Sequence, residues 1–273
     1  MNLETTVKLN NGVEIPAVGL GVFKSEPGEE TEQAVRWALE TGYRHIDTAA
    51  LYANEQDVGK GIKASGIDRD QIFITTKIWN TDQGYENTLR AFDDSRKKLQ
   101  IDIVDLYLIH WPVTGKYKET WTALEKLYVE GKVRAIGVSN FLVHHLEDLL
   151  AESDIVPAVN QVEFHPFLVQ RDLLEFGREK NIRHEAWSPL TRGRRLDHPL
   201  IQELSAKYEK SPAQILIRWD IDLGVITIPK SVHRARIDEN SQVFDFEIED
   251  QDVERLLALD AGERIGPDLD TFV

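Results

Sequence analysis

Eight short apolar runs, each followed by a more charged amphipathic segment, constrain the fold of this chain more than any other feature of its sequence. Most of the runs are almost continuously apolar rather than alternating, which is typical of parallel strands buried on both faces. Strand and helix alternate eight times, which favours an α/β fold of the (β/α)8 TIM barrel type over an open doubly wound sheet. The expected strands are residues 17–23, 43–49, 72–79, 104–111, 133–140, 158–164, 182–188 and 225–230.

The amphipathic segments between the runs are expected to be helices. Residues 28–42 carry acidic side chains in their first turn and end at Gly42, as helix termini prefer. Residues 85–100 and 118–132 place apolar side chains at helical spacing. These are Leu89, Phe92 and Leu99 in the first segment and Trp121, Leu124, Leu127 and Tyr128 in the second. Two helical patterns, 198–210 and 211–224, precede the last strand, which is one more than the plain repeat requires.

We predict a single domain over residues 1–273. A β-hairpin over residues 6–15 turns at Asn11-Gly12 and is expected to be a lid over the N-terminal end of the barrel. The eight strands occupy residues 17–230. Beyond them, an extra C-terminal helix over residues 251–262 leads into a polar tail, so that 251–273 form the C-terminal helix and tail.

Composition limits the classes of partner. The chain is 41% hydrophobic and 29% charged, which is ordinary for a globular protein. Its formal net charge of -15 disfavours nucleic acid and anionic membrane surfaces, and fits either a salty habitat or simple solubility. Cysteine is absent, which excludes disulfides, thiolate metal ligation and a cysteine nucleophile. Without a signal peptide or a long apolar run, we expect a cytoplasmic protein, and without an exposed apolar stripe, a monomer.

Polar residues gather where six of the expected strands end. In a barrel of this type, functional groups lie at the C-terminal ends of the strands and in the loops that follow. A single aspartate at a strand end is usually only a cap or turn residue, so the convergence of several side chains is the argument for a site. The residues are Asp47, Lys77, His110, Ser139 with Asn140, Gln161 and Lys230.

Lys77 lies in an otherwise apolar strand, where an ammonium is costly to bury unless an acid pairs with it. Asp47, at the same level one strand away, is the expected partner. Tyr52 could fold back so that its hydroxyl meets the ammonium, and we expect the cation to lower the pKa of the phenol from about 10. Such a proton donor suits hydride addition to a carbonyl, with His110 orienting the same oxygen. The alternative for His110 is a satisfied core histidine.

A hydride donor is required, and without cysteine or an evident flavin or metal site a nicotinamide is the simplest choice. Ser139, Asn140 and Gln161 offer hydrogen bonds to its carboxamide, and Trp187 offers a flat face for the ring, although Trp187 could equally belong to the core. The segment GKGIKA (59–64) matches a dinucleotide fingerprint formally but lies inside a helical pattern, so it is discarded. After the eighth strand, Lys230, Ser231 and Arg236 favour a 2'-phosphate of NADP over a merely solvated helix face.

Six motifs resemble the aldo-keto reductase family in order and spacing: GYRHIDTAALYANE, VDLYLIHWP, IGVSNF, NQVEFHP, AWSPL and IPKS. The resemblance covers nearly the whole chain and implies a (β/α)8 barrel, NAD(P)H-dependent carbonyl reduction and a catalytic tetrad of Asp47, Tyr52, Lys77 and His110. It also implies cofactor contacts, with the nicotinamide carboxamide, the ring, the adenosine phosphate and adenine as targets. The implied contact residues are Ser139, Asn140, Gln161, Trp187, Ser188, Leu190, Lys230, Ser231, Val232, Arg236, Glu239 and Asn240.

Within the family, the chain is most similar to small bacterial glyoxal and methylglyoxal reductases, and next to 2,5-diketo-D-gluconate reductases. Arg183 and His184 depart from the pattern, because an apolar residue would be usual in the seventh strand. Three arginines after that strand are expected either to touch the cofactor pyrophosphate or to be solvated; they are Arg192, Arg194 and Arg195. The short tail argues against bulky substrates such as steroids.

We therefore expect NADPH-dependent reduction of small aldehydes and ketones, with broad specificity and with Tyr52 as the general acid. The substrate pocket is expected to be lined by His110 and by an aromatic wall of Phe23, Trp79, Trp111 and Phe272. Two alternatives remain open: a reductase of diketo sugar acids, and a non-catalytic regulatory subunit that binds NADP. A metal-dependent hydrolase is disfavoured, because the histidines give no plausible ligand set with Asp47; they are His110, His144, His145 and His165.

Overall fold

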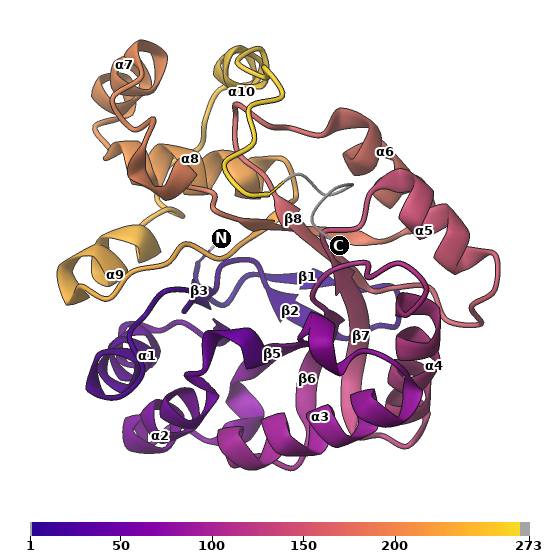
Figure 1. Cartoon of the computed structure of the whole chain (residues 1–273). Coiled ribbons are helices and arrows are strands. Elements are labelled where there is room, and N and C mark those ends of the chain that lie inside the picture. Colours follow the sequence, from indigo (N-terminus) through magenta and orange to yellow (C-terminus); the bar gives the residue numbers. More distant parts are fainter. Residues whose placement is uncertain (1, 268–273) are drawn as a thin grey trace.

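Eight parallel strands form one sheet that curls into a closed barrel in the computed structural model, which describes residues 2–267 (Figure 1). The strand order β10-β9-β8-β7-β6-β5-β4-β3 follows the sequence in reverse. Parallel bridges between Val18 and Thr227 and between Gly21 and Lys230 join the first and last strands of this sheet. The predicted (β/α)8 barrel is thus confirmed. Its strands are β3 Leu20–Gly21, β4 His45–Asp47, β5 Phe73–Ile78, β6 Val104–Ile109, β7 Val133–Ser139, β8 Val159–Glu163, β9 Arg183–Trp187 and β10 Ile226–Thr227.

The first and last strands of the barrel are much shorter than the apolar runs that predicted them. The backbones approach very closely at this seam: a Cβ on Gly21 would lie 2.8 Å from the carbonyl oxygen of Ile228. A Cβ on Gly19 would lie 3.1 Å from Cγ2 of Ile228 across the seam, and 2.6 Å from Nδ1 of the His45 ring of β4. The two glycines therefore permit closure of the ring. Regular strand pairing in β3 and β10 extends over only two residues of each strand.

Helices surround the sheet (Figure 1), and apolar side chains of the helices pack with those of the strands in shared clusters. The helix predicted over 28–42 ends at Gly42, which adopts a left-handed conformation with φ 116° and donates its N–H to Ala38 and Leu39. GKGIKA lies inside a helix as expected, and Gly59 lets that helix approach the backbone of Leu99. The helices are α1 Glu29–Thr41, α2 Glu55–Ser65, α3 Tyr85–Leu99, α4 Tyr117–Val129, α5 Val143–Leu150, α6 Arg171–Lys180, α7 Pro199–Tyr208, α8 Pro212–Asp222, α9 Arg234–Ser241 and α10 Asp250–Leu257.

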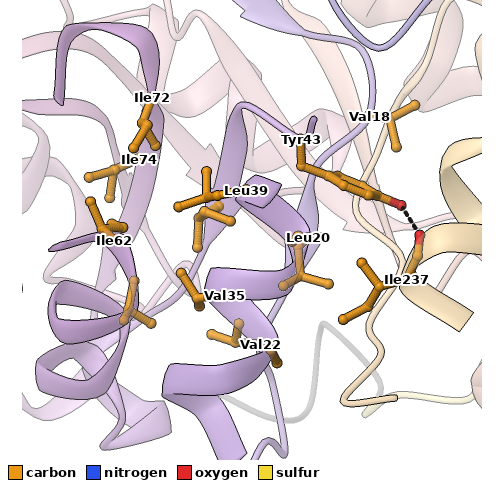
Figure 2. Packing of buried hydrophobic residues seen from close by; sticks show 14 of the residues in the cluster. Val18, Leu20, Val22, Val35, Leu39, Tyr43, Ile62, Ile72, Ile74 and Ile237 are labelled. Atoms are coloured by element: carbon orange, nitrogen blue, oxygen red, sulfur yellow. Dashed lines mark hydrogen bonds between the residues drawn. The ribbon is translucent and has the colours of Figure 1, made fainter. Parts of the chain in front are cut away.

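The largest apolar layer lies between the outer face of the sheet and the surrounding helices. Figure 2 shows part of it, where Val18, Leu20 and Val35 pack together and the Tyr43 hydroxyl donates to the carbonyl of Ile237 over 3.2 Å. The side chains of α3 and α4 behave as their spacing predicted, and all of those named above except the partly exposed Leu89 and Tyr128 are buried. These layers hold the strand ends in fixed relative positions, as a site built from several strands requires.

The N-terminal hairpin closes the bottom of the barrel. Strands β1 Thr6–Lys8 and β2 Glu14–Pro16 pair antiparallel, and Leu9 and Ile15 are buried against the inward residues at the start of the barrel strands. Side-chain hydrogen bonds fasten the hairpin, among them Asn10 to Pro157 O at 3.0 Å, Asn11 to Arg134 O at 2.9 Å and Arg183 to Lys8 O at 3.0 Å. Arg183, which departs from the family pattern, therefore holds the lid.

No helix between residues 2 and 267 is long and apolar enough to cross a membrane. The tail beyond residue 267, including Phe272 of the expected aromatic wall, lies outside the described residues.

Candidate active site

The four predicted catalytic side chains come together at the C-terminal ends of three neighbouring strands. Asp47 ends β4, Lys77 is the last residue but one of β5, and His110 directly follows β6. Tyr52 ends a short 3-10 helix, Ala50–Tyr52, and the next residue, Ala53, has a left-handed φ of 56° that turns the chain back. This turn returns the phenol to the barrel mouth, which we define as the end of the barrel opposite the hairpin.

Lys77 is the centre of the cluster. Its Nζ donates to Asp47 Oδ1 at 2.7 Å, to the carbonyl of Thr48 at 2.9 Å and to the hydroxyl of Tyr52 at 3.4 Å. The lysine side chain is fully buried and Asp47 is 2% exposed, so the ion pair is dry. An ammonium in such a position is tolerable only because its three N–H groups are all used and a carboxylate balances its charge.

The pKa shifts of the pair follow from this burial. Burial lowers the pKa of Lys77, but the carboxylate of Asp47 and the nearby Tyr52 outweigh it and carry the pKa above its ordinary value. Burial raises the pKa of Asp47, while Lys77 and Gln161 oppose the rise by donating to the carboxylate. Lys77 is therefore a permanent cation at neutral pH.

The expectation that the pKa of Tyr52 would be lowered is wrong. Burial of the phenol raises its pKa more than the Lys77 ammonium lowers it, and Asp47 and, once ionised, Glu185 add to the rise. Tyr52 therefore keeps its proton at neutral pH. Lys77 remains the group that would stabilise the phenolate as that proton is given away.

His110 faces the phenol from the neighbouring strand. The ring centroids of His110 and Tyr52 are 5.8 Å apart at an interplanar angle of 76°. Burial and the charge of Lys77 hold the pKa of His110 well below its ordinary value, so the imidazole is neutral. The side-chain amide of Asn140 donates to the His110 carbonyl over 2.9 Å and fixes the backbone there. The neutral ring can serve as a hydrogen-bond donor to a carbonyl oxygen.

Three of the expected wall residues surround this pair of rings. Phe23 is 41% exposed and lies 5.0 Å from the Tyr52 ring. Trp79 contacts His110 edge-on at 5.2 Å, and Trp111 lies roughly parallel to it at 6.5 Å. The surroundings of Tyr52 and His110 are thus largely aromatic.

Ser139, Asn140, Gln161 and Trp187 form one hydrogen-bonded group beside the tetrad. The Ser139 hydroxyl donates to the backbone carbonyl of Gln161 at 2.8 Å and accepts from the side-chain amide of Asn140 at 3.1 Å. Trp187 donates its indole N–H to Asn140 Oδ1 at 2.9 Å. Asn140 itself adopts a left-handed φ of 64°, which turns its side chain back toward the strand ends. The structure brings the four predicted nicotinamide ligands together.

Gln161 has a role that the sequence did not indicate. Its Nε2 donates to Asp47 Oδ2 and to Glu185 Oε2, both at 2.8 Å. Both hydrogens of the Gln161 side-chain amide are therefore used, so the side-chain oxygen Oε1 is the atom left to accept from a carboxamide. Glu185 was overlooked in the sequence. Its position offered a signal, because in β9 it shares the inward-facing parity of Trp187 and is the neighbour of Gln161 in the sheet register.

The predicted phosphate ligands lie where β10 meets α9. Ser231 accepts from the backbone N–H of His233, which precedes the helix, at 3.2 Å. Lys230 and Arg236 are exposed, and neither forms an ion pair with any residue between 2 and 267, whereas Arg234 pairs with Glu40 and Asp238. Two unpaired cations and helix N–H groups fit an anionic phosphate. Val232 is half-buried, Glu239 exposed and Asn240 buried on the same segment.

The loop after β9 connects the nicotinamide group to the C-terminal segment. It begins with Ser188 and Leu190, both half-buried. The Arg192 guanidinium lies 5.9 Å over the Trp187 ring. Arg195 pairs with Glu263, and Arg194 lines, with Arg195 and Arg264, a cavity of about 220 Å³ between the loop and the segment. Arg195 is thus an exposed arginine that is already ion-paired, and not an unpaired cation.

A buried carboxylate, Glu163, holds the C-terminal segment over the barrel mouth. It accepts the backbone N–H groups of Ile265 at 2.6 Å and Gly266 at 3.0 Å. Gly266 packs so closely on Trp187 that a Cβ would lie 2.4 Å from Cη2 of the indole. Glu163 was not predicted as a site residue.

His184, the second departure from the family pattern, faces away from this site. Its ring fills the space left by Gly177 of α6, where a Cβ would lie 2.6 Å from Cε1. Burial lowers the pKa of His184 to about 4, so it is a neutral packing residue. Within residues 2–267, no three or more His, Cys, Asp or Glu side chains are grouped so that they could hold a metal ion.

Comparison with known proteins finds relatives that match nearly the whole chain. The protein-family model described as "Aldo/keto reductase family" matches residues 17–261. The chain is 55% identical to the glyoxal reductase of Bacillus subtilis (strain 168) over 100% of this chain and 99% of that protein. It is 45% identical to the methylglyoxal reductase DkgA of Escherichia coli (strain K12), over 98% of each chain. The crystal structure of a Bombyx mori aldo-keto reductase in complex with NADP is 37% identical, with a TM-score of 0.92 over 97% of this chain and 96% of that chain.

Proposed function

The chain belongs to the aldo/keto reductase family, and from this premise we propose that it reduces small aldehydes and ketones to alcohols with NADPH. It is an oxidoreductase, as the family and the named relatives indicate. The observation that carries the finer proposal is the position of Lys77 Nζ between Asp47 Oδ1 and Tyr52 Oη. We further propose that the protein acts as a single-domain monomer in the cytoplasm.

The residues of the site divide the work on a carbonyl as follows. Tyr52 and His110 hold the carbonyl oxygen between a phenol O–H and an imidazole N–H. As negative charge develops on that oxygen, Tyr52 transfers its proton, and Lys77 stabilises the resulting phenolate. Asp47 keeps Lys77 charged and in place through the contact of 2.7 Å. The apolar rings of Phe23, Trp79 and Trp111 exclude water from the reacting atoms.

A bound NADPH supplies the hydride that adds to the carbonyl carbon. The nicotinamide carboxamide would be held by Ser139, Asn140 and the carbonyl oxygen of Gln161, with the ring against Trp187. Ser188 and Leu190 would follow the pyrophosphate, and Lys230, Ser231, Val232 and Arg236 the 2'-phosphate, with Glu239 and Asn240 near the adenine. The Bombyx mori relative solved in complex with NADP and the two unpaired cations, Lys230 before α9 and Arg236 on it, support this assignment.

Small dicarbonyls are the proposed substrates. The two named relatives reduce glyoxal and methylglyoxal by their names, and share 55% and 45% of their residues with this chain over nearly its full length. The site walls are largely apolar rings, which bind small carbonyls with little selectivity. Broad specificity therefore belongs to the proposal.

Oxidation of NADPH, followed by its absorbance, tests the reaction directly. Methylglyoxal, a 2,5-diketo sugar acid and an aromatic aldehyde are compared, each with and without a chelator. We expect turnover of methylglyoxal and of the aromatic aldehyde, unaffected by chelation. Binding of NADPH without turnover of any carbonyl would instead indicate a regulatory subunit, and loss of turnover with the chelator would indicate a metal-dependent enzyme.

A reductase of diketo sugar acids is the second candidate, and Arg192 favours it. The guanidinium lies over Trp187 at the barrel mouth and forms no ion pair within residues 2–267, so a substrate carboxylate could pair with it. The test is the Arg192→Ala variant with the sugar acid and with methylglyoxal. A rise in KM confined to the sugar acid would support this candidate.

A further inference from the structure

We infer that Glu185 is a positioning residue of the reductase site, which acts through Gln161 on Asp47 and sets the charge around Lys77 and Tyr52 by holding or releasing a proton. This inference rests on the proposed function. It concerns a residue that touches neither the carbonyl nor the proton that Tyr52 transfers, and so it goes beyond the tetrad.

An unbroken chain of hydrogen bonds connects Glu185 to the phenol. Glu185 Oε2 accepts from Gln161 Nε2, which also donates to Asp47; Asp47 accepts from Lys77, and Lys77 reaches Tyr52. Glu185 and Gln161 are neighbours in adjacent strands, whereas Asp47 lies on β4, the fourth strand from β8 in either direction around the barrel. The Gln161 amide therefore crosses the interior and ties opposite walls together.

Charge balance decides the state of Glu185. The charged groups that face it are Asp47 of β4 and Lys77 of β5, and the other titratable groups nearby are Tyr52 and His45. Burial and Lys77 lower the pKa of His45 to about 3, so this histidine is neutral although its Nε2 lies 3.6 Å from Glu185 Oε1. One ammonium therefore serves two buried carboxyl groups, and Asp47 has the direct contact. Burial and the charge of Asp47 raise the pKa of Glu185 to about 8.

Two protonation states of the site follow. Below about pH 8, Glu185 is a neutral acid, and the Asp47–Lys77 pair leaves the barrel interior without net charge. Above it, a second carboxylate adds an uncompensated negative charge, because neither the sheet neighbour of Glu185 in β10, Ile226, nor Gln161 is ionisable. That charge makes Tyr52 a weaker acid, since it opposes formation of the phenolate. Carbonyl reduction should slow as Glu185 ionises.

The pH dependence of kcat tests this in wild type and in the Glu185→Gln variant, which keeps a planar hydrogen-bonding group without a titratable proton. We expect wild-type kcat to fall at least about threefold between pH 7 and pH 9, in line with a weaker general acid, and the variant to change less than about twofold. The matched control is Asp220→Asn. Asp220 is also a buried acid with a raised pKa, but it lies on α8 and pairs with Thr227 outside this network. It should keep the wild-type decline.

A second measurement does not depend on turnover. Wild-type protein labelled with 13C at the glutamate carboxyl carbons should show one resonance that titrates near pH 8, which the Glu185→Gln variant lacks. Identical declines in kcat for wild type and Glu185→Gln, or titration of all glutamates below about pH 5, would overturn the inference. If wild type fails to oxidise NADPH with any carbonyl, the proposed function fails, while the resonance still reports on Glu185.

Discussion

The ammonium of Lys77 and the hydroxyl of Tyr52 lie 3.4 Å apart, within hydrogen-bonding reach, at the point where two neighbouring strands end. Removing the hydroxyl separates proton donation from everything else that the site does. We expect Tyr52→Phe to lower kcat by about 10²- to 10⁴-fold, the usual contribution of a general acid, while the Kd of NADPH changes by less than about threefold. Single-turnover kinetics and fluorescence titration measure the two quantities.

The control for this variant is Tyr43→Phe, which also removes a buried hydroxyl. Tyr43 donates to the backbone carbonyl of Ile237 on α9, in the outer apolar layer and outside the catalytic tetrad (Figure 2). Its loss should cost about 1 kcal/mol of unfolding free energy, the net worth of one hydrogen bond, and leave kcat unchanged. Normal turnover by Tyr52→Phe would contradict the assignment of the acid.

Replacing Lys77 by methionine should affect both stability and catalysis. The substitution leaves Asp47 buried without its cation, so we expect a loss of about 3–5 kcal/mol in the free energy of unfolding, measured by denaturant titration. The double variant Asp47→Asn, Lys77→Met should recover most of this stability, because no uncompensated charge remains. Neither variant should recover kcat. Recovery of activity in the double variant would show that Lys77 serves only to neutralise Asp47.

Arg236 and Arg234 lie two residues apart on α9 and allow a matched comparison. Arg236 forms no ion pair within residues 2–267, whereas Arg234 is held by Glu40 and Asp238. We expect Arg236→Ala to raise the Kd of NADPH about tenfold or more, as loss of a charged hydrogen bond would, and to leave the Kd of NADH within about twofold. Arg234→Ala should change neither. Equal losses with both cofactors would rule out contact with the 2'-phosphate.

Glu185 should also make the stability of the protein depend on pH. Its folded pKa of about 8 lies above the ordinary value, so between about pH 4.3 and pH 8 the unfolded chain releases a proton that the folded protein retains. The free energy of unfolding therefore falls by about 1.4 kcal/mol for each pH unit in this window from this group. Glu185→Gln removes that slope, so the variant should gain stability relative to wild type as the pH rises to about 8. Denaturant titrations at several pH values measure the difference.

Glu163→Gln is the control with the opposite sign. Although burial raises the pKa of Glu163, His165 and the N–H groups of Ile265 and Gly266 outweigh it, and the pKa is lowered. Its stabilising contribution is present above the unfolded pKa and is lost as the pH falls. The variant should therefore be less stable than wild type near neutrality and approach it on acidification. Parallel behaviour of the two variants would contradict the buried neutral acid at position 185.

The clustering of the four side chains could be predicted from the sequence because they lie in or shortly after apolar runs, and the fold carries all strand ends to one edge. Lys77 was informative on its own, because an ammonium inside a buried strand requires a partner. The direction of the Tyr52 shift could not be predicted, because it depends on how much water the folded loop removes from the phenol. Glu185 was missed for a related reason: its bond to Gln161, and through it to Asp47, exists only once the barrel is closed.

The short seam between β3 and β10 has a consequence for how the chain acquires its structure. Residue 18 pairs with residue 227, and Arg183 fastens the lid formed by residues 6–16. The hairpin and β3 are synthesised before the other elements of the barrel, so nearly all of these must follow before the main partners of this segment exist. Such sequence-distant pairing is slow to form, because the chain entropy of closure is lost before the contacts repay it. We expect the nascent amino-terminal region to stay sensitive to proteases until translation has passed β10, when the ring can close.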